Sequence, residues 1–306
     1  MLSIVVPVFN EEESLALFYK ELRSSLKSDE NYEVIFIDDG STDSSLKILR
    51  EIAQKDKTVR VYSFRKNQGK AEALTLGFEK IKGNCVVTLD ADLQDQPNQI
   101  SLLQAMLDSG FDLVSGWRKN RKDTFKHVIF SKVFNFFART LWGVKLHDYN
   151  CGLKIYTAEC AKSLRLYGGL HRFIPLLAYQ QGFKVTEIPV IHQKRQFGKS
   201  KYSISKVWKD LPDMFTMFFL SKYGKRPMHF FGIIGFIFLL IGFGILTYLT
   251  VTKIFYEQSV GNRPILFLGM LLVLGGLQIL FTGFLADLMI NKSHQQNSPA
   301  LKFSTE

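Results

Sequence analysis

Cysteine and histidine are scarce in this sequence, whose 306 residues include three cysteines and six histidines. The cysteines are Cys85, Cys151 and Cys160, an odd number without any C-x-x-C spacing. This pattern argues against a disulfide framework and against a thiolate zinc site, and it indicates reduced, mostly buried thiols in a cytosolic compartment. We expect core or surface roles for the histidines that show no ligand spacing, namely His127, His147, His171 and His192.

Two common sequence signals are also missing. The N-terminus has no basic segment before its first apolar stretch, and Pro7 interrupts that stretch. We therefore expect a strand there and no signal peptide. Gly69 and Lys70 precede a predicted helix, but without the G-x-x-x-x-G-K-[ST] spacing of a P-loop. Lys70 can still meet a pyrophosphate group from the start of that helix.

Short apolar runs instead alternate with helical patterns along the first part of the chain. The predicted strands cover 3–8, 33–37, 59–64, 85–89 and 111–115, and the predicted helices cover 44–53, 71–81 and 99–107. This alternation predicts an α/β domain whose mostly parallel sheet is covered on both faces. In such sheets, ligands bind beyond the carboxyl ends of the strands.

Polar turns follow three of these strands, at 9–12, 38–43 and 90–94. The turn at 90–94 offers oxygen ligands of the kind that hard cations such as Mg²⁺ and Mn²⁺ prefer. A cation bound there would share its coordination sphere with substrate phosphates. If extended geometry continues past the strand, the side chains of Asp90, Asp92 and Gln94 point to one side. The pattern indicates a metal site, and the alternative is a solvated acidic turn.

Four ordered motifs resemble those of inverting glycosyltransferases of family 2, which have the GT-A fold. They are Val6-Pro7-Val8-Phe9-Asn10-Glu11-Glu12, Asp38-Asp39-Gly40-Ser41-Thr42-Asp43, Asn67-Gln68-Gly69-Lys70 and Asp90-Ala91-Asp92-Leu93-Gln94. Two further features resemble the polyprenyl-phosphate subgroup, meaning dolichyl-phosphate mannose synthase and its bacterial relatives. These are Gln94 and the basic stretch Arg195-Gln196-Phe197-Gly198-Lys199-Ser200-Lys201. The resemblance covers residues 1–225 by motif and the remainder by architecture.

The resemblance implies that a nucleotide sugar binds at the carboxyl edge of the sheet, with Mg²⁺ or Mn²⁺ on its diphosphate. Asp92 is then the metal anchor and a catalytic residue, with Asp90 and Gln94 as further ligands. The implied donor-binding residues are Pro7, Asn10, Glu12, Asp39, Lys70 and Asp90. For Asp39, a turn-capping role is the alternative.

The implied acceptor is a polyprenyl phosphate, which is already anionic near pH 7 and does not strictly need a general base. Cationic groups are required to hold its phosphate, and arginine suits bidentate contacts. The candidates are Arg118, Arg121, Arg195 and Lys201, with an ordinary surface position as the alternative for each arginine. Asp148 lies in a segment that resembles the element closing over the donor sugar. It is a second catalytic candidate, with sugar contact, a base or a helix cap as its possible roles.

The C-terminal third contains two long apolar runs, 230–251 and 265–286. Each is long enough to cross a hydrocarbon core of about 30 Å. Lys222, Lys225 and Arg226 precede the first run and Lys292 follows the second, which predicts a multi-pass protein of the inner (plasma) membrane with both termini and the catalytic domain in the cytoplasm. The predicted parts are a GT-A catalytic domain (1–200), juxtamembrane amphipathic helices (201–228), two transmembrane helices (229–290) and a cytoplasmic tail (291–306).

The formal net charge is +11, and basic residues alternate with aromatics in 118–145 and 194–226. Helical spacing of apolar residues over 125–141 predicts an amphipathic helix. It either packs with a solvated basic face or lies on anionic membrane lipid. Nucleic acid is not expected as a partner, because the apolar runs and acidic turns argue against it. Glycines in both apolar runs allow close helix contact, so a homo-oligomer and simple lipid-facing spans both stay open.

UDP-glucose is the first predicted donor, because a chain with two spans is most similar to bacterial undecaprenyl-phosphate glucosyltransferases. The alternatives are UDP-N-acetylglucosamine, a UDP-aminoarabinose derivative, and GDP-mannose with dolichyl or another polyprenyl phosphate. A processive polysaccharide synthase is not expected, because the Gln-x-x-Arg-Trp motif is missing and the spans are too few for a channel. A non-catalytic membrane scaffold is the alternative from another class, and the intact Asp92 argues against it.

Overall fold

The computed structural model describes residues 1–26, 31–119, 144, 146–193, 215–216, 218–219, 222–224, 226–257, 259 and 264–294. The chain divides into two compact units, 1–214 and 215–306, which we describe separately.

In the first unit the strands are β1 (Leu2–Val8), β2 (Tyr32–Asp38), β3 (Val59–Ser63), β4 (Cys85–Thr88), β5 (Leu113–Trp117), β6 (Lys154–Thr157) and β7 (Val185–Pro189). The helices are α1 (Leu15–Ser25), α2 (Ser45–Lys55), α3 (Lys70–Lys80), η1 (Pro97–Gln99), α4 (Ile100–Asp108), α6 (Ala158–Ser163), η2 (Gly168–Phe173) and α7 (Ile174–Gln180).

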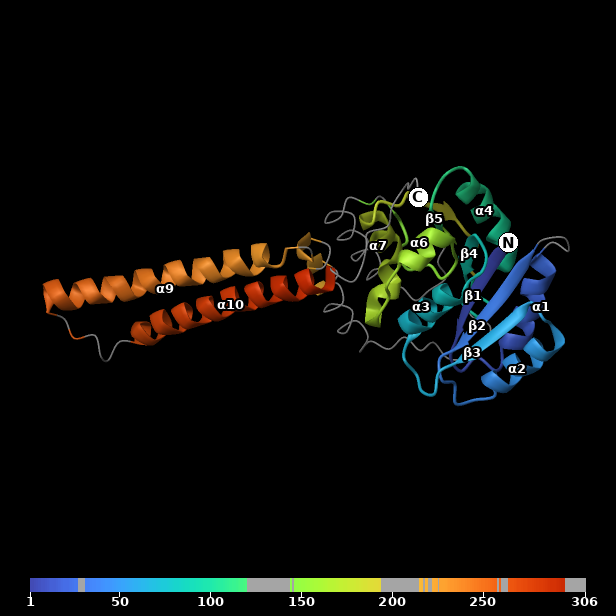
Figure 1. The fold of residues 1–306 in the computed structure, drawn as a ribbon, viewed down its shortest axis with the longest axis horizontal. Helices are drawn as coiled ribbons and strands as arrows, with labels where there is room; N and C mark the ends of the chain where they lie inside the picture. Colours follow the sequence, from blue (N-terminus) through green and yellow to red (C-terminus); the bar gives the residue numbers. More distant parts are fainter. Residues whose placement is uncertain are drawn as a thin grey trace. The chain divides into compact units, whose positions relative to one another are not determined.

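The seven strands form one sheet in the order β3-β2-β1-β4-β6-β5-β7. Figure 1 labels β1 to β5 of this sheet. The pairs that β1 makes with β2 and β4 are parallel, as are β2 with β3 and β5 with β7. Only β6 is antiparallel, to both of its neighbours, β4 and β5. The mostly parallel sheet expected from the sequence is therefore confirmed. Because β6 runs the other way, its first residue, Lys154, lies beside Thr88 at the carboxyl end of β4.

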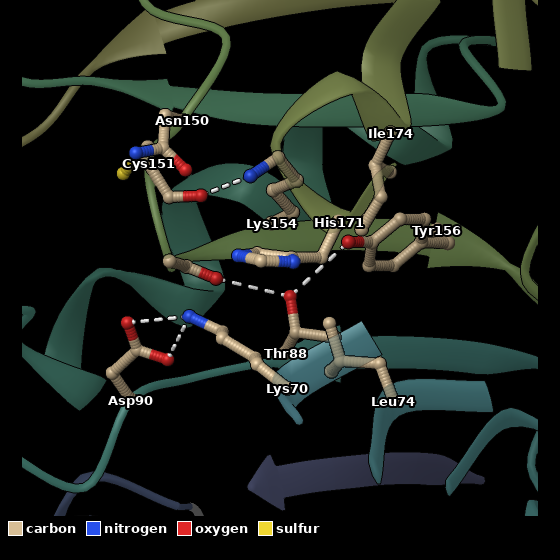
Figure 2. A pocket seen from close by; sticks show the side chains of 11 residues that line it. Lys70, Leu74, Thr88, Asp90, Asn150, Cys151, Lys154, Tyr156, His171 and Ile174 are labelled. Carbon is tan, nitrogen blue, oxygen red and sulfur yellow. Dashed lines mark hydrogen bonds and ion pairs between the residues drawn. The ribbon is translucent and has the colours of Figure 1, made fainter. Parts of the chain in front are cut away.

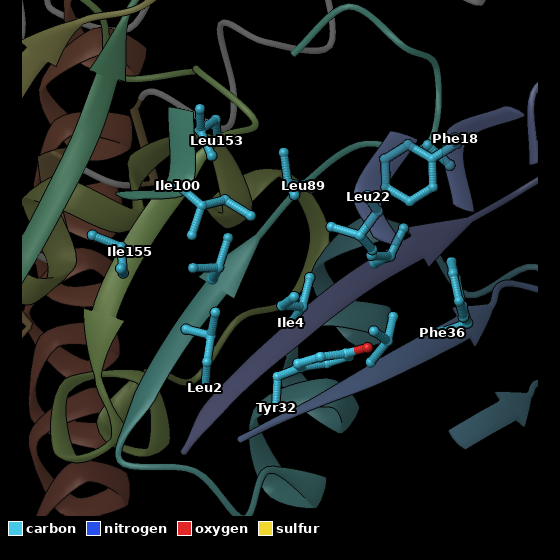
Figure 3. Packing of buried hydrophobic residues seen from close by; sticks show 14 of the residues in the cluster. Leu2, Ile4, Phe18, Leu22, Tyr32, Phe36, Leu89, Ile100, Leu153 and Ile155 are labelled. Atoms are coloured by element: carbon cyan, nitrogen blue, oxygen red, sulfur yellow. The ribbon is translucent and has the colours of Figure 1, made fainter. Parts of the chain in front are cut away.

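Helices cover both faces of the sheet, and successive residues of β1 show how. Ile4 and Val6 belong to a core cluster that includes Phe18 and Leu22 of α1, whereas Val5 belongs to a second cluster with Leu74 and Phe78 of α3, among others. Alternate side chains of a strand point to opposite faces, so a strand covered on both faces must be apolar throughout. Figure 3 shows the first cluster between the sheet and the helices on that face.

Pro7 is tolerated inside β1 because of where β4 stops. A proline cannot donate a ladder hydrogen bond. The pairing of β1 with β4 ends at Val5↔Thr88, while the pairing with β2 continues through Pro7↔Ile37. Pro7 thus lies beyond the β4 partner, near the edge where the polar turns begin.

The second unit contains two long helices, α9 (Met228–Tyr256) and α10 (Pro264–His294). The predicted apolar runs fall within them, and both helices are long and apolar enough to cross a membrane. Only 11% of the most apolar window of each is buried, whereas the core helix of a soluble domain would be mostly buried. By length, composition and exposure, these helices fit the expected membrane hairpin.

Glycines account for the close contact between α9 and α10. A Cβ built on Gly235 would lie 2.8 Å from the carbonyl oxygen of Gly276, and a Cβ on Gly276 would lie 2.8 Å from that of Gly235. Gly242 and Gly269 likewise meet the opposite helix. These four glycines therefore serve packing within one chain, which is the small-residue contact common between membrane helices.

Candidate active site

The first two polar turns are joined at the carboxyl edge by side chains that accept backbone N–H groups. Asn10 Oδ1 accepts from Thr42 N at 2.8 Å, and Glu12 Oε2 accepts from Ser44 N at 2.8 Å. Asn10 itself has a φ of 51°, a left-handed conformation that asparagine tolerates better than most residues. Asn10 and Glu12, both predicted to bind the donor, thus hold the loop after β2 in place.

Asp39 anchors the loop that leads into α3. Its carboxylate accepts from Gln68 N at 2.7 Å, from Gly69 N at 3.1 and 3.0 Å, and from Asn67 Nδ2 at 2.9 Å. Burial raises the pKa of Asp39, while these hydrogen bonds act against that rise. The predicted contact with the nucleotide stays a prediction, and the observed role is to fix the start of the helix that carries Lys70.

Gly40 permits this close approach of the two loops. Its φ is +68°, and a Cβ there would lie 2.5 Å from the carbonyl carbon of Lys66. A side chain at this position would meet backbone atoms that cannot move aside. The Asp-Gly pair after β2 is thus explained by packing at the site edge.

The third turn departs from strand geometry earlier than the sequence suggested. The strand β4 ends at Thr88, and Leu93 adopts a left-handed φ of 60°, which costs a non-glycine residue about 1–2 kcal/mol. Extended geometry therefore does not continue through Asp90, Asp92 and Gln94. Instead the turn folds back, and Asp92 Oδ1 accepts from Gln94 N at 3.1 Å.

Asp90 faces Lys70. The ammonium group of Lys70 donates to both carboxylate oxygens, at 2.6 and 2.8 Å (Figure 2). Burial opposes ionisation of Asp90, but the charge of Lys70 and its hydrogen bonds hold the pKa of this carboxyl below its ordinary value. Two residues predicted separately from the sequence, on α3 and after β4, are thus brought together.

Gly152 closes over this turn from the segment before β6. A Cβ on Gly152 would lie 2.7 Å from Asp90 Oδ2 and 2.8 Å from Asp95 Oδ2. Any side chain would collide with one of two carboxylates. Gly152, the last residue of the Asp148–Gly152 element, therefore lies against the acidic turn, and the contact of this element with the donor sugar stays a prediction.

Asp148 and Arg118 form a bidentate ion pair. Arg118 Nε donates to Asp148 Oδ2 at 2.6 Å and Nη2 donates to Oδ1 at 2.9 Å. Glu187 on β7 accepts the backbone N–H of Asp148 at 3.1 Å, which fixes the segment. Asp148 does not cap a helix in the described chain. The sequence predicts a catalytic role for Asp148 and an acceptor-binding role for Arg118, and it does not indicate that the two residues pair.

A small pocket is lined in part by Asp90 of the acidic turn (Figure 2). Its lining includes Lys70, Asp90, Thr88, Gly152, Lys154 and His171. Lys154 is buried, its ammonium group donates to the carbonyl oxygen of Cys151, and burial lowers its pKa to about 8. The arrangement places two lysines and one carboxylate around a pocket that adjoins the predicted metal turn.

Neither Lys154 nor Asp95 was predicted as a site residue, and His192 was expected to have a core or surface role. Asp95 accepts from Leu153 N at 3.0 Å and contacts His192 Nδ1 at 3.1 Å. Asp95 directly follows the Asp90–Gln94 motif and His192 lies three positions before Arg195, where the basic stretch begins, so proximity to the motifs was a usable signal. Three predicted acceptor residues, Arg121, Arg195 and Lys201, lie outside the described residues.

The donor set of the acidic turn fits Mg²⁺ or Mn²⁺. Asp90 and Asp92 supply carboxylates and Gln94 an amide oxygen, and hard cations complete their shell with phosphate oxygens and water. The described residues hold no group of three or more His, Cys, Asp or Glu that could bind a metal ion. Lys70 on Asp90 shows that this position already stabilises positive charge.

The described thiols fit their sequence-based expectation. All three cysteines are free, with Cys151 and Cys160 buried and Cys85 partly buried. Burial raises the pKa of the Cys151 thiol well above its ordinary value. A thiol of this kind is a packing residue and a poor nucleophile.

Comparison with known proteins supports the resemblance inferred from the motifs. The family model described as "Glycosyl transferase family 2" matches residues 3–165. A dodecaprenyl-phosphate galacturonate synthase of Rhizobium johnstonii is 35% identical over 303 residues, covering 97% of this chain and 90% of that one. An undecaprenyl-phosphate 4-deoxy-4-formamido-L-arabinose transferase of Proteus mirabilis is 33% identical over 256 residues, covering 83% and 77%.

Solved structures share the architecture of the first unit. Glucosyl-3-phosphoglycerate synthase from Mycobacterium tuberculosis in complex with UDP aligns with a TM-score of 0.55 at 19% identity, over 72% of this chain and 79% of that one. The same enzyme with Mn²⁺, UDP-glucose and phosphoglyceric acid aligns with a TM-score of 0.53 at 20% identity, over 73% and 79%. At such identities the likeness concerns the fold.

Proposed function

Because the chain belongs to glycosyl transferase family 2, we propose that it transfers a sugar from a nucleotide diphosphate to a polyprenyl phosphate at the membrane surface. The chain is a glycosyltransferase with the GT-A fold, as the sequence predicted. The names of both relatives contain a polyprenyl phosphate, dodecaprenyl phosphate in one and undecaprenyl phosphate in the other, and the first relative aligns over 97% of this chain.

The observation that carries the proposal is the convergence of the motifs at one edge of the sheet. Asp90, Lys70 and Gly152 come from three separate segments, and they meet within hydrogen-bond or packing distance. A diphosphate requires cations, and a sugar requires hydrogen-bonding groups beside it. The edge offers both in one place, where ligands of such sheets bind.

In this proposal, different residues bind the nucleotide sugar and the polyprenyl phosphate. A divalent cation held by Asp92, Asp90 and Gln94, when bound, would neutralise the charge that develops on the leaving diphosphate. Lys70 would leave Asp90 for the diphosphate, since its ammonium group can exchange one anionic partner for another. Asp39 holds the loop before α3 so that Lys70 starts its helix at the right place.

The acceptor oxygen is anionic before the reaction, so the chain need only position it. The phosphate oxygen forms a bond to the anomeric carbon from the face opposite the diphosphate, and the bond from that carbon to the diphosphate oxygen breaks. This displacement inverts the anomeric centre. We assign Arg118 to the acceptor side, with Asp148 fixing the orientation of its guanidinium group through the bidentate pair. Arg121, Arg195 and Lys201 remain predicted contacts for the same phosphate.

UDP-glucose remains the first donor proposed from the sequence, and a uronic acid donor is the second candidate. The name of the relative from Rhizobium johnstonii contains galacturonate, and the pocket contains two lysines, Lys70 and Lys154. A sugar carboxylate would find cationic partners there. The name of the second relative adds 4-deoxy-4-formamido-L-arabinose as a third candidate.

We place the enzyme in the inner membrane through α9 and α10, with the catalytic unit on the cytoplasmic side. Lys222 and Arg226 precede α9, and Lys292 lies near the end of α10. Lysine and arginine in short flanking segments favour the cytoplasmic side. The sugar donor is soluble whereas the acceptor phosphate lies at the bilayer surface, so this location brings the two substrates together.

The test is transfer of radiolabel by membranes that contain the full-length protein. Labelled UDP-glucose, UDP-galacturonate, UDP-N-acetylglucosamine, GDP-mannose and a UDP-aminoarabinose derivative are each incubated with undecaprenyl phosphate. We expect label from one donor to become lipid-extractable, and we expect the signal to vanish in EDTA and in Asp92→Asn membranes. A lack of lipid-linked label from every donor would refute the proposal, and full activity in EDTA would refute the metal.

A further inference from the structure

A buried hydrogen-bonded chain connects the metal turn to the segment after β7. Asp95 Oδ1 lies 3.1 Å from His192 Nδ1, and both side chains are 5% exposed. His192 Nε2 lies 3.4 Å from Gln94 Nε2. The backbones are joined as well, since Gln193 N donates to Gln94 O at 2.8 Å. Two segments almost a hundred residues apart are thus tied together at the predicted ligand Gln94.

The hydrogen-bonding groups fix the tautomer of His192. The carboxylate of Asp95 accepts a hydrogen bond from His192, so Nδ1 of His192 carries a proton. In the tautomer that carries its proton on Nδ1, Nε2 is an acceptor. The group that faces it must be a donor, and the amide nitrogen of Gln94 is one.

A second acceptor fixes the orientation of the same amide. Gln94 Nε2 also lies 3.4 Å from the carbonyl oxygen of Gln193. If the amide were inverted, Oε1 would face that carbonyl oxygen and the lone pair of His192, which are two repulsive contacts. The amide nitrogen therefore stays toward residues 192–193, and no described residue donates to Oε1. That oxygen is the atom a hard cation requires.

We propose that His192 is a positioning residue that turns the amide of Gln94 so that its oxygen is presented to the divalent cation, with Asp95 holding the imidazole in the required tautomer. The inference rests on the proposed metal-dependent function. A carboxylate that orients a histidine, which in turn orients a ligand, is a common device around metal sites, and its loss weakens metal affinity about 10- to 100-fold.

The experiment measures Mn²⁺ affinity for the purified full-length enzyme with saturating UDP, by the electron paramagnetic resonance signal of free Mn²⁺. The informative variant is His192→Asn. Its amide N–H can replace Nδ1–H at Asp95 and so keep the fold contact, but it has no atom at the position of Nε2. The set also contains Gln94→Ala, the double variant, and His229→Asn on α9 as a matched control.

We expect His192→Asn to weaken Mn²⁺ binding at least about tenfold, with metal-free UDP affinity and unfolding temperature unchanged. Gln94→Ala should weaken it similarly, and the double variant should be no weaker than Gln94→Ala, because both changes remove one interaction. His229→Asn should bind as the wild type.

Two results would overturn the inference about His192 alone. One is wild-type Mn²⁺ affinity in His192→Asn when Gln94→Ala is impaired, and the other is a double variant that shows the product of both losses. If the wild-type enzyme with UDP takes up no Mn²⁺, the proposed metal-dependent function fails and the role of His192 fails with it. If His192→Asn unfolds at a lower temperature and its metal-free UDP affinity also falls, the residue is structural and the inference is wrong.

Discussion

Arg118 binds both carboxylate oxygens of Asp148, with Nε at 2.6 Å from Oδ2 and Nη2 at 2.9 Å from Oδ1. The side chains are 11% and 5% exposed. Burial by itself would lower the pKa of Arg118, but the hydrogen bonds and the charge of Asp148 outweigh this effect and raise the pKa above its ordinary value. A substitution of either residue therefore also leaves the other without its partner.

This pairing makes the stability of Arg118→Ala a sharp test. Removing the guanidinium group leaves the Asp148 carboxylate buried without its partner, which typically costs about 3–5 kcal/mol. We expect a lower free energy of unfolding in denaturant titrations of the detergent-solubilised enzyme. The double variant Arg118→Ala/Asp148→Asn should recover part of the loss. Unchanged stability together with a raised KM for polyprenyl phosphate would instead make Arg118 a phosphate ligand whose pairing with Asp148 is incidental.

Lys70 should matter for donor binding more than for stability. Lys70 and Asp90 are each about one-third exposed, and exposed ion pairs contribute at most about 1 kcal/mol. Loss of a charge-assisted contact to a diphosphate costs more, so Lys70→Met should raise the KM for the nucleotide sugar about tenfold. Steady-state kinetics with saturating polyprenyl phosphate measures this. Lys47→Met on α2 is the matched control, and an unchanged KM in Lys70→Met would remove Lys70 from the donor site.

Because of Lys154, the free energy of unfolding should change with pH in the alkaline range. Burial lowers its pKa in the folded protein to about 8 from the ordinary 10.5. Between those values the unfolded chain binds more protons than the folded one, so the free energy of unfolding gains a contribution as pH rises. The stability difference between wild type and Lys154→Met should therefore shift in favour of the wild type from pH 8 to 10.5.

Unfolding temperatures across that range measure the effect. The exposed Lys162→Met on α6 should show no such trend relative to the wild type, since its amine is solvated in both states. A pH-independent difference for Lys154→Met would mean that the buried amine keeps its ordinary pKa.

The topology of α9 and α10 can be tested with single cysteines and an impermeant thiol reagent on intact cells. A cysteine at Glu257, between the two helices, should react from outside. A cysteine inserted directly after Met1 and a cysteine at Ser298 should stay protected until the cells are permeabilised, because both termini are predicted to be cytoplasmic. External labelling at Ser298, a position outside the described residues, would show one span or a re-entrant segment and contradict the hairpin.

Local sequence patterns predicted the first five strands of the sheet, but they did not predict β6 and β7. Fully apolar runs such as 33–37 predict buried strands because both faces of the sheet exclude water. The segment 154–157 offered no comparable signal, and its antiparallel insertion between β4 and β5 depends on long-range pairing. That insertion brings Lys154 beside Thr88 and so completes the pocket.

The sequence by itself determined the family, the class of chemistry and the acidic turn that carries it, because motif spacing and strand-end position are local properties of the chain. Only the tertiary structure decided which charges meet. Arg118 with Asp148, Lys70 with Asp90, and His192 with Asp95 are separated by 30, 20 and 97 positions. Such pairs are set by the order of the strands in the sheet, which brings segments together that are far apart in the sequence. The residues next to a charged side chain in the sequence do not indicate its partner in the folded protein.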